Sequence, residues 1–173
     1  MHSELVPHVT KNDSLLGLVE RSTAYKQGLI HRSIHGLIKN EQGLYLLQQR
    51  SSTKSAWPDK IDLSLGETVK PDESYEDALR RGLSEELGVE AKSVEVLRDR
   101  YYQEYFWDEY KVFCIVCLFL VTTDQEITLT DGEVSNIWWR TKDEIGNLIS
   151  SDPTTCTPWL VADWQYLLEQ NKL

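Results

Sequence analysis

Cysteine is scarce in this chain of 173 residues, and no apolar run is long enough to cross a membrane. The longest apolar run is 112–121, whereas a membrane-spanning helix needs about twenty such residues. This run is typical of a strand buried on both faces. It contains Cys114 and Cys117, which would face opposite sides of a strand and so cannot chelate a metal as a pair. With Cys156 the cysteine count is odd, so we expect packing cysteines rather than a disulfide framework.

Basic residues are also in short supply. The 18 Lys and Arg are outnumbered by 28 Asp and Glu, which gives a formal charge of −10. This balance argues against a nucleic-acid polymer or an anionic membrane as the main partner. It does not exclude a nucleotide, because a bound metal inverts the local sign of charge. The first eight residues lack the basic and apolar regions of a signal peptide, and we therefore expect a cytoplasmic protein.

The chain has no internal repeat and no low-complexity linker, and its length predicts a single domain over residues 1–173. A helical turn is expected at 21–27 and helices at 75–87, 141–149 and 157–168. Several neighbouring strands are separated only by turn sequences, so we expect a mixed sheet covered by helices, an α+β fold. The predicted strands are 4–10, 15–20, 30–39, 44–50, 61–65, 94–106, 112–121 and 133–140, with hairpins joining the first two, the next two, and 94–106 with 112–121.

The helix near the middle of the chain has clear start and stop signals. Ser74 is followed three residues later by Asp77, a pattern that caps a helix N-terminus. Gly88 follows the last turn and can adopt the left-handed conformation that ends a helix. A buried stripe is predicted from the four-residue spacing of Tyr75, Leu79, Leu83 and Leu87. Arg81, Glu85 and Glu86 are then expected to point away from the core.

Glu85 and Glu86 stand side by side in the last turn of this helix. The helix dipole is negative there, so two acids need compensation. A divalent cation would supply it, because Mg²⁺ takes one or two protein carboxylates together with substrate phosphates. A solvated helix end, with Arg81 pairing with Glu85 four residues away, would also supply it. The helix alone leaves both readings open.

The stretch 64–89 resembles the Nudix box, the motif G-x5-E-x7-R-E-U-x-E-E-x-G-U, in which U is a large apolar residue. The matching residues are Glu73, Arg81, Glu85, Glu86, Leu87, Gly88 and Val89. The resemblance implies that Glu85 and Glu86 bind Mg²⁺ or Mn²⁺. It also implies that Glu73 and Arg81 form a supporting salt bridge between loop and helix. Two positions depart from the motif: Glu67 stands where it has its glycine, and Gly82 where it has the first glutamate after the arginine.

Gly82 needs an explanation, since glycine inside a helix costs on the order of 1 kcal/mol relative to alanine. Either a ligand or the backbone approaches closely there, or the chemistry has moved to another acid, or hydrolysis has been lost. Glu67, in the loop before the helix, is one candidate for the missing carboxylate, and an exposed loop acid is the alternative. Glu133 resembles an acid that serves many family members as a ligand or base from a separate loop; its alternative is a solvated strand start. Glu67 and Glu133 are therefore the catalytic candidates.

The resemblance extends from about residue 4 to about residue 168. The segments that carry it are 31–40, 46–51, 54–58, 133–139 and 157–161. They are similar to the Nudix branch that contains isopentenyl diphosphate isomerase and its hydrolase relatives. The implied fold is an α/β/α sandwich around a mixed sheet, with residues 1–29 as an N-terminal extension. The isomerase's catalytic cysteine and the metal-binding histidine after it are missing, since Gly66 and Thr68 stand in their places.

Substrate-binding candidates follow from charge and from this resemblance. Arg50 and Lys54, with Lys60, flank the loop before the box, and arginine binds phosphate in a bidentate manner. His31 and Trp159 align with isomerase site residues, although ordinary packing would also account for each. The leading hypothesis is a Mg²⁺-dependent hydrolase that cleaves a diphosphate linkage in a nucleoside diphosphate derivative or an isoprenoid diphosphate. The alternatives are a Nudix-fold binding module without turnover, and an allylic diphosphate isomerase.

Overall fold

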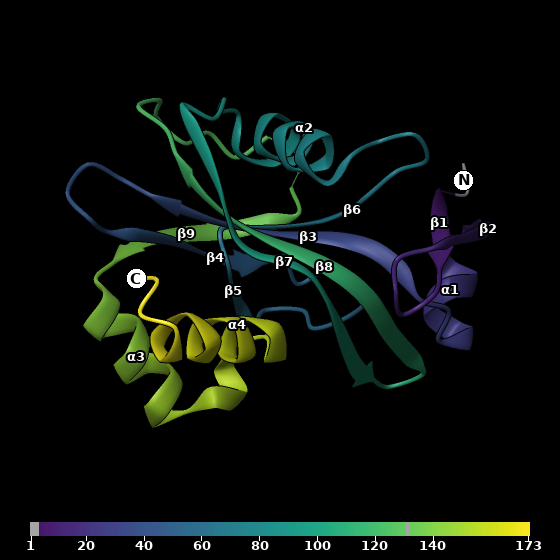
Figure 1. Cartoon of the computed structure of the whole chain (residues 1–173). Helices are drawn as coiled ribbons and strands as arrows, with labels where there is room; N and C mark the ends of the chain where they lie inside the picture. The colour runs from purple at the N-terminus through teal and green to yellow at the C-terminus, as the bar shows by residue number, and fades with distance from the viewer. Residues whose placement is uncertain (1–3, 131) are drawn as a thin grey trace.

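The computed structural model describes residues 4–130 and 132–173, and in these ranges nine strands form one mixed sheet with helices on both faces (Figure 1). The helices are α1 (Arg21–Gln27), α2 (Tyr75–Leu87), α3 (Lys142–Ser151) and α4 (Pro158–Glu169), with a 3-10 turn at Pro153–Thr155. The strands are β1 (Leu5–Val9), β2 (Leu15–Glu20), β3 (His31–Lys39), β4 (Tyr45–Arg50), β5 (Ile61–Asp62), β6 (Leu65–Thr68), β7 (Ser93–Trp107), β8 (Tyr110–Thr122) and β9 (Val134–Arg140).

Strand β3 lies at the centre of the sheet. It runs parallel to β8 from His31, opposite Cys114, to Lys39, opposite Thr122. Its other edge pairs with β6 in antiparallel fashion, and the N-terminal hairpin of β1 and β2 joins it where His8 lies opposite His31. The segment predicted as an N-terminal extension therefore continues the sheet. The long β7–β8 hairpin predicted from the aromatic and apolar runs is confirmed.

The predicted hairpin between 30–39 and 44–50 is wrong in extent. Strands β3 and β4 pair only where Lys39 lies opposite Tyr45, and β4 pairs instead with β9 and β5. The reason is that β8 and β6 occupy both edges of β3. The Ser64 hydroxyl connects β3 and β4 where the two strands separate. It accepts a hydrogen bond from the Ile38 amide at 2.8 Å and donates one to the Leu46 carbonyl at 2.6 Å. This bridge also interrupts the predicted strand 61–65 and leaves β5 and β6 as separate strands.

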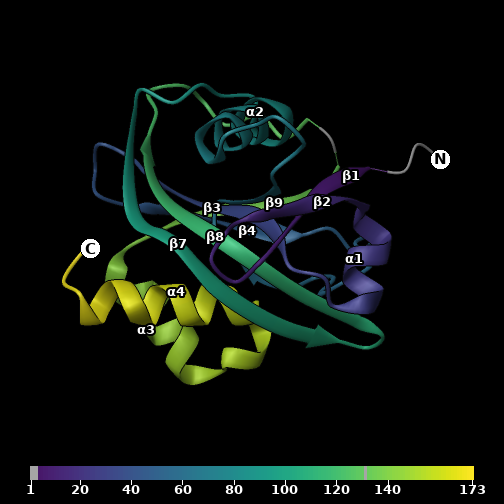
Figure 2. The same cartoon turned by 45° about the vertical axis from the view of Figure 1, so that its right-hand side comes forward.

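Two apolar cores cover the two faces of the sheet, so the α/β/α sandwich is confirmed (Figures 1 and 2). Helix α2 covers one face, and α3 and α4 cover the other. Cys114 belongs to the core under α4 and Cys117 to the core under α2, as the alternation of a strand predicts. All three cysteines are buried free thiols. In the described ranges, no helix combines the length and apolar character needed to cross a membrane.

Helix α2 has the predicted caps. The Asp77 amide donates to the Ser74 hydroxyl and the Asp77 carboxylate accepts from the Ser74 amide, both at 3.1 Å, and Gly88 has a left-handed φ of 64°. The last carbonyls of α2 accept hydrogen bonds from a neighbouring loop, with the Thr128 amide 2.9 Å from the Leu87 oxygen. These bonds hold the chain that leads to Glu133 against the end of α2.

Leu83 is fully buried under α2, whereas its neighbour Ser84 is exposed. Replacing Leu83 with alanine should lower the free energy of unfolding by about 2–5 kcal/mol, because it leaves a cavity between the helix and the sheet. Urea denaturation would measure the loss. Ser84→Ala is the matched control and should change stability by less than about 0.5 kcal/mol. Equal effects of the two substitutions would contradict the observed packing of α2.

Candidate active site

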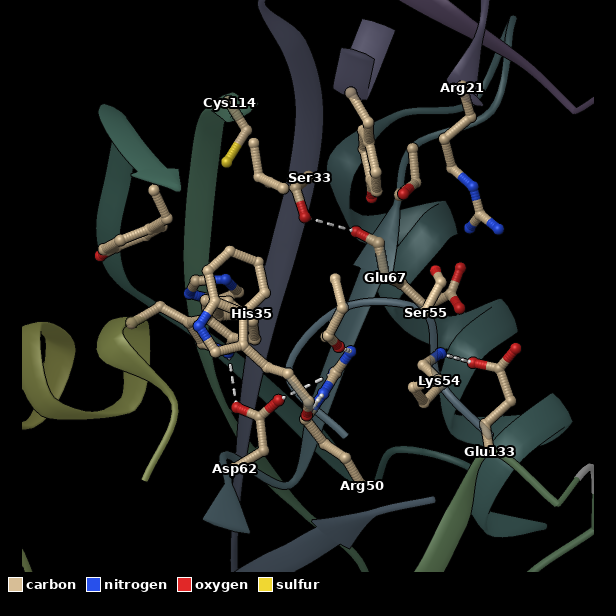
Figure 3. A pocket seen from close by; sticks show the side chains of 18 of the residues that line it. Arg21, Ser33, His35, Arg50, Lys54, Ser55, Asp62, Glu67, Cys114 and Glu133 are labelled. Carbon is tan, nitrogen blue, oxygen red and sulfur yellow. Dashed lines mark hydrogen bonds and ion pairs between the residues drawn. The ribbon is translucent and has the colours of Figure 1, made fainter. Parts of the chain in front are cut away.

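A cavity of about 440 Å³ opens between the sheet, the loop 51–60 and the start of α4, within the range typical of small-molecule sites. Figure 3 shows Glu67, Lys54 and Glu133 on one side of it, and His35, Arg50 and Asp62 on the other. We call Glu67, Glu133 and the adjacent Glu86 the acidic cluster. The aromatic end is formed by Trp57, Tyr105 and Trp159, whose rings pack with centroids 4.9–6.5 Å apart.

The expectation that Glu85 and Glu86 both point away from the core is wrong for Glu86. Glu86 is only 4% exposed. The Glu85 side chain is 55% exposed and accepts a hydrogen bond from Arg81 at 3.1 Å. The helical rotation accounts for the difference. Glu86 lies four residues after Gly82, and residues at this spacing share one face of a helix. The neighbouring acids therefore have different environments.

Gly82 makes room for Glu67. A Cβ atom at position 82 would lie 2.6 Å from the Cγ atom of Glu67, closer than non-bonded carbons approach one another, and 3.0 Å from a Leu65 methyl group, which is a tight contact. The Glu67 side chain thus occupies the space that a side chain at position 82 would need. The group that approaches this glycine is the side chain of an acid on the facing strand, whereas the expectation named the backbone or a ligand.

Burial dominates the electrostatics of the acidic cluster. Desolvation, followed by the negative charges of Glu67 and Glu133, raises the pKa of Glu86 well above its usual range. A hydrogen bond between the carboxyl groups of Glu86 and Glu67 acts in the same direction. Within the part of the chain that the structure describes, the Glu86 Oε1 atom is buried without a hydrogen-bond partner. The cluster therefore contains a carboxyl oxygen that lacks a donor or a cation.

Arg81 connects the loop, strand β6 and helix α2. Its Nε atom donates to Glu73 at 2.7 Å, so the predicted salt bridge is present. It also donates to Glu67 at 2.7 Å and to the Thr68 carbonyl at 2.9 Å. Burial acts against the charge of Glu73, but its hydrogen bonds with Arg81 prevail and lower the pKa of Glu73. Arg81 thereby fixes the position of Glu67 beside Gly82.

The predicted phosphate-binding groups are engaged by the protein itself. The Arg50 guanidinium donates to the carbonyls of Trp57 and Ala56, each at 2.9 Å, and to the carboxylate of Asp62 at 3.2 Å. It therefore fixes the loop 51–60, which forms one wall of the cavity. Lys54 reaches the cavity and pairs with Glu133, as Figure 3 shows. Lys60 bonds to the Thr154 carbonyl at 2.5 Å and does not line the cavity.

His31 and Trp159 both line the cavity and are both largely buried. Desolvation lowers the pKa of His31 to about 4, so its ring is neutral at pH 7. The Trp159 ring donates from Nε1 to Asp62 at 2.5 Å. Asp62 is 1% exposed and also accepts from the Thr157 hydroxyl at 2.9 Å. Trp159 is therefore held in a fixed orientation at the aromatic end.

The sequence reasoning missed a buried polar group in the cavity wall. His35 and Gln103 line the cavity, and both bond to Asp163 of α4, which is 0% exposed. A signal was available, because Asp163 lies midway between Trp159 and Leu167 on the apolar stripe of its helix. An acid on such a stripe is buried only when it is paired, so it requires partners in the fold.

Comparison with known proteins places the chain in a family. The NUDIX domain model matches residues 29–159. The chain belongs to the NUDIX family. An uncharacterized Nudix hydrolase of Pseudomonas aeruginosa is 33% identical over 135 residues, 77% of this chain and 76% of that protein. Isopentenyl-diphosphate Delta-isomerase 1 of Photorhabdus laumondii is 28% identical over 170 residues, 97% of each chain. The crystal structure of DR0079 from Deinococcus radiodurans has a TM-score of 0.69 and 23% identity, covering 86% of this chain and 90% of that one, and so shares the fold.

The acidic cluster suits a hard cation. Its donors are carboxylate oxygens, and the unpartnered Oε1 of Glu86 is a position where a cation would replace a missing partner. Across residues 4–130 and 132–173, no group of three or more His, Cys, Asp and Glu side chains is placed so that it could hold a metal ion. Mg²⁺ does not need one, since it keeps water ligands and takes one or two carboxylates together with substrate phosphates. The residues present therefore fit Mg²⁺ or Mn²⁺.

The buried neutral His31 predicts a pH dependence of stability. The pKa is about 4 in the folded chain and 6.5 in an exposed histidine, so the unfolded chain binds more protons between these values. Stability should fall by up to about 3 kcal/mol as the pH drops from about 6.5 to about 4. Urea denaturation at pH 7 and pH 5 would measure the loss, and His31→Gln should reduce it. Identical losses in the two proteins would contradict a buried, neutral His31.

Proposed function

We propose that this protein is a Mg²⁺- or Mn²⁺-dependent hydrolase that cleaves a diphosphate linkage in a small-molecule substrate. One observation carries the proposal: the Glu67 side chain fills the space above Gly82, next to the buried Glu86. The position at which the chain departs from the Nudix box therefore still has a carboxylate beside it. The loss of a glutamate from the helix is offset by the gain of one on the facing strand.

In this proposal Glu86 and Glu67 hold the cation. When bound, the cation offsets the charge of the diphosphate oxygens and makes the phosphorus easier to attack. Arg81 keeps Glu67 in place, and its pairing with Glu73 ties it to the loop before the helix. Glu85, predicted as a second ligand from the motif, contacts Arg81 from the exposed side. Its role as a ligand stays a prediction, which the variants below test.

Glu133 is our candidate for the base that activates water. Its side chain is 44% exposed and lines the cavity, so water can reach it, whereas Glu67 is 18% exposed and is held by Arg81. Lys54 pairs with Glu133 and also lines the cavity. A phosphate entering there would meet this lysine, which can exchange the carboxylate for phosphate oxygens.

Two other functions remain as alternatives. Similarity along almost the whole chain favours an isomerase related to the Photorhabdus protein. Against it, Gly66 offers no side chain where that enzyme type has its cysteine, and burial raises the pKa of the Cys114 thiol, also in the cavity wall, to about 12. The second alternative is a binding module that has the same cavity but does not turn over its ligand. Incubation with a panel of nucleoside diphosphate derivatives and isoprenyl diphosphates, followed by chromatography of the phosphate-containing products, separates hydrolysis from both.

Metal binding should be visible without any substrate. Mg²⁺ or Mn²⁺ at about 100 times the dissociation constant should stabilise the fold by about 2.7 kcal/mol. In a chain of this length that corresponds to a rise in Tm of several degrees. Glu86→Gln should abolish the rise and should stabilise the metal-free protein, because it removes an acid that is buried near two others.

Glu85→Gln is the matched control, since it changes the adjacent and exposed acid. It should leave most of the metal-dependent rise in Tm. If Glu85→Gln abolishes the rise as completely as Glu86→Gln, the neighbouring pair predicted from the motif is the ligand set. If metal has no effect on wild type, the proposed metal dependence is wrong.

Exchanging the residues at positions 67 and 82 tests directly whether Glu67 takes the place of a glutamate at position 82. Gly82→Glu alone should clash with Glu67 and lower stability by about 1–3 kcal/mol. Glu67→Gly alone should lower kcat/KM by about 10² or more, because it removes a carboxylate from the cluster. The double variant should recover stability and most of the activity. Formation of the hydrolysis products, followed by chromatography, and urea denaturation would give the two readouts.

The double variant separates relocation of the acid from simple damage. Two independent defects would add, so an additive double variant would show that Glu67 does not replace the missing helix glutamate. Glu67→Gln is the conservative control, since it keeps the packing against Gly82 and removes the charge. It should lose activity while it keeps wild-type stability to within about 1 kcal/mol.

A further inference from the structure

The loop 51–60, which carries Lys54 into the cavity, contains a residue with an unfavourable backbone conformation. Trp57 has a left-handed φ of 49°. This conformation is unusual for a bulky residue, and Pro58 follows it, although the residue before a proline is normally extended. Such strain persists only where neighbouring groups enforce it, and strained residues cluster at functional sites. The loop therefore needs groups that hold it.

Arg50 supplies the contacts that hold the middle of the loop. Its guanidinium donates from Nε to the Trp57 carbonyl and from Nη2 to the Ala56 carbonyl, each at 2.9 Å. One rigid, planar group thus binds the strained residue and the residue before it. The Trp57 ring is buried against Trp159, with ring centroids 4.9 Å apart. Both the backbone and the side chain of Trp57 are therefore held.

The two ends of the loop are held in a different way, by main-chain hydrogen bonds. The Arg50 amide donates to the Lys60 carbonyl, and the Ser51 amide donates to the Glu133 carbonyl, each at 2.9 Å. The middle of the loop lies between these bonds and depends on the Arg50 guanidinium. Loss of the guanidinium contacts should therefore displace the middle of the loop and leave the adjoining strands in place.

Asp62 holds Arg50 in turn. It is 1% exposed, and its two carboxylate oxygens bind different parts of the fold. Its Oδ2 atom accepts from Arg50 Nη1 at 3.2 Å, as Figure 3 shows. Its Oδ1 atom accepts from the Thr157 hydroxyl at 2.9 Å, the Trp159 ring at 2.5 Å and the Leu63 amide at 2.8 Å. One carboxylate therefore joins the loop to the start of α4.

We propose that Asp62 is a positioning residue, which acts through Arg50 to hold the loop 51–60 in the conformation that places the Lys54 ammonium beside Glu133. Asp62 binds Arg50, Arg50 binds the loop backbone, and the loop carries Lys54, which lines the cavity and pairs with Glu133. The role rests on the proposed function, because it matters to catalysis only if Lys54 meets the phosphate of the substrate.

Asp62→Asn separates the two groups of contacts. The asparagine amide has one accepting oxygen and one donating NH₂ group. Its oxygen suits the position of Oδ1, where three donors meet, and its NH₂ group then faces Arg50, which can only donate. The substitution therefore keeps the contacts with α4 and breaks the contact that leads to the loop.

The first measurement needs no substrate. Acetylation by acetic anhydride, followed by mass spectrometry, reports how free the Lys54 amine is, with the exposed Lys92 as an internal reference. Asp62→Asn should raise acetylation of Lys54 relative to Lys92 about fivefold, because the displaced loop no longer pairs Lys54 with Glu133. Arg50→Gln breaks the same contact from the other side and should have the same effect, so the test does not depend on one variant.

Thr157→Val is the matched control. It removes a donor from the other oxygen of Asp62, and it also removes the side chain that caps α4. It should therefore lower stability, as Asp62→Asn does, without affecting the contact between Asp62 and Arg50. Acetylation of Lys54 should stay at the wild-type level.

The second measurement tests the coupling between positions 62 and 54. Calorimetry with methylenediphosphonate, a diphosphate analogue that is not hydrolysed, would give dissociation constants in the presence of Mg²⁺. Asp62→Asn and Lys54→Met should each weaken binding about tenfold, and the double variant should bind no more weakly than either. The rise in Tm with Mg²⁺ alone should be the same in wild type and Asp62→Asn, because the acidic cluster is built on other elements.

The outcomes separate the positioning role from the proposed function. If acetylation of Lys54 does not change in Asp62→Asn and Arg50→Gln, or rises equally in Thr157→Val, the positioning role is wrong. Additive losses of binding in the double variant would also overturn it, since Asp62 would then act independently of Lys54. If acetylation changes as expected but wild type binds no methylenediphosphonate, the positioning role stands and the proposed diphosphate site fails.

Discussion

The arrangement of the cavity depends on one costly feature, a carboxyl group removed from water. Glu86 is 4% exposed, faces Glu67, and has Oε1 without a partner among the described residues. Folding would not favour such an arrangement for its own sake, since a buried polar atom without a hydrogen-bond partner is unfavourable. The surrounding structure imposes it. Arg81 holds Glu67 on one side, and the loop bonded to the end of α2 leads to Glu133 on the other.

The cavity has two ends with different chemistry, and each is built on a different layer of the sandwich. The acidic cluster takes Glu86 from α2 and Glu67 from β6, together with Glu133 just before β9. The aromatic end takes Trp159 from α4 on the opposite layer, and Asp163 lies on the same helix. The sheet fixes the spacing between the two, because β3 lies between the cores and carries His35 toward one of them. Neither end alone would form the cavity, because residues of both line it.

Local signals predicted the fold well, and long-range pairing limited the rest. The caps at Ser74 and Gly88, the alternation of Cys114 and Cys117, and the β7–β8 hairpin all follow from neighbouring residues, and all are confirmed. The hairpin expected between β3 and β4 failed, because which strands occupy the two edges of β3 is decided by segments far along the chain.

In the candidate site, too, local signals were reliable and contacts between distant segments were not. The motif located the right helix, but adjacency in sequence suggested that Glu85 and Glu86 act alike, and only the packed helix separates them. Arg50 was expected to meet phosphate, whereas partners inside its own loop take up its donors. Asp163 could not be matched with His35, Tyr101 and Gln103 from the sequence. These partners come from β3 and β7 and lie 128, 62 and 60 positions before it.

The contact between Glu67 and Gly82 also constrains how such a chain could have arisen. A lineage passing from a helix glutamate to a strand glutamate one substitution at a time must cross an intermediate state. With both glutamates the intermediate is overcrowded, since even a single carbon at position 82 would lie 2.6 Å from its neighbour. With both glycines it packs without conflict but has one acid fewer. A route by single substitutions would therefore pass through a chain that packs without conflict but has one acid fewer in the cluster.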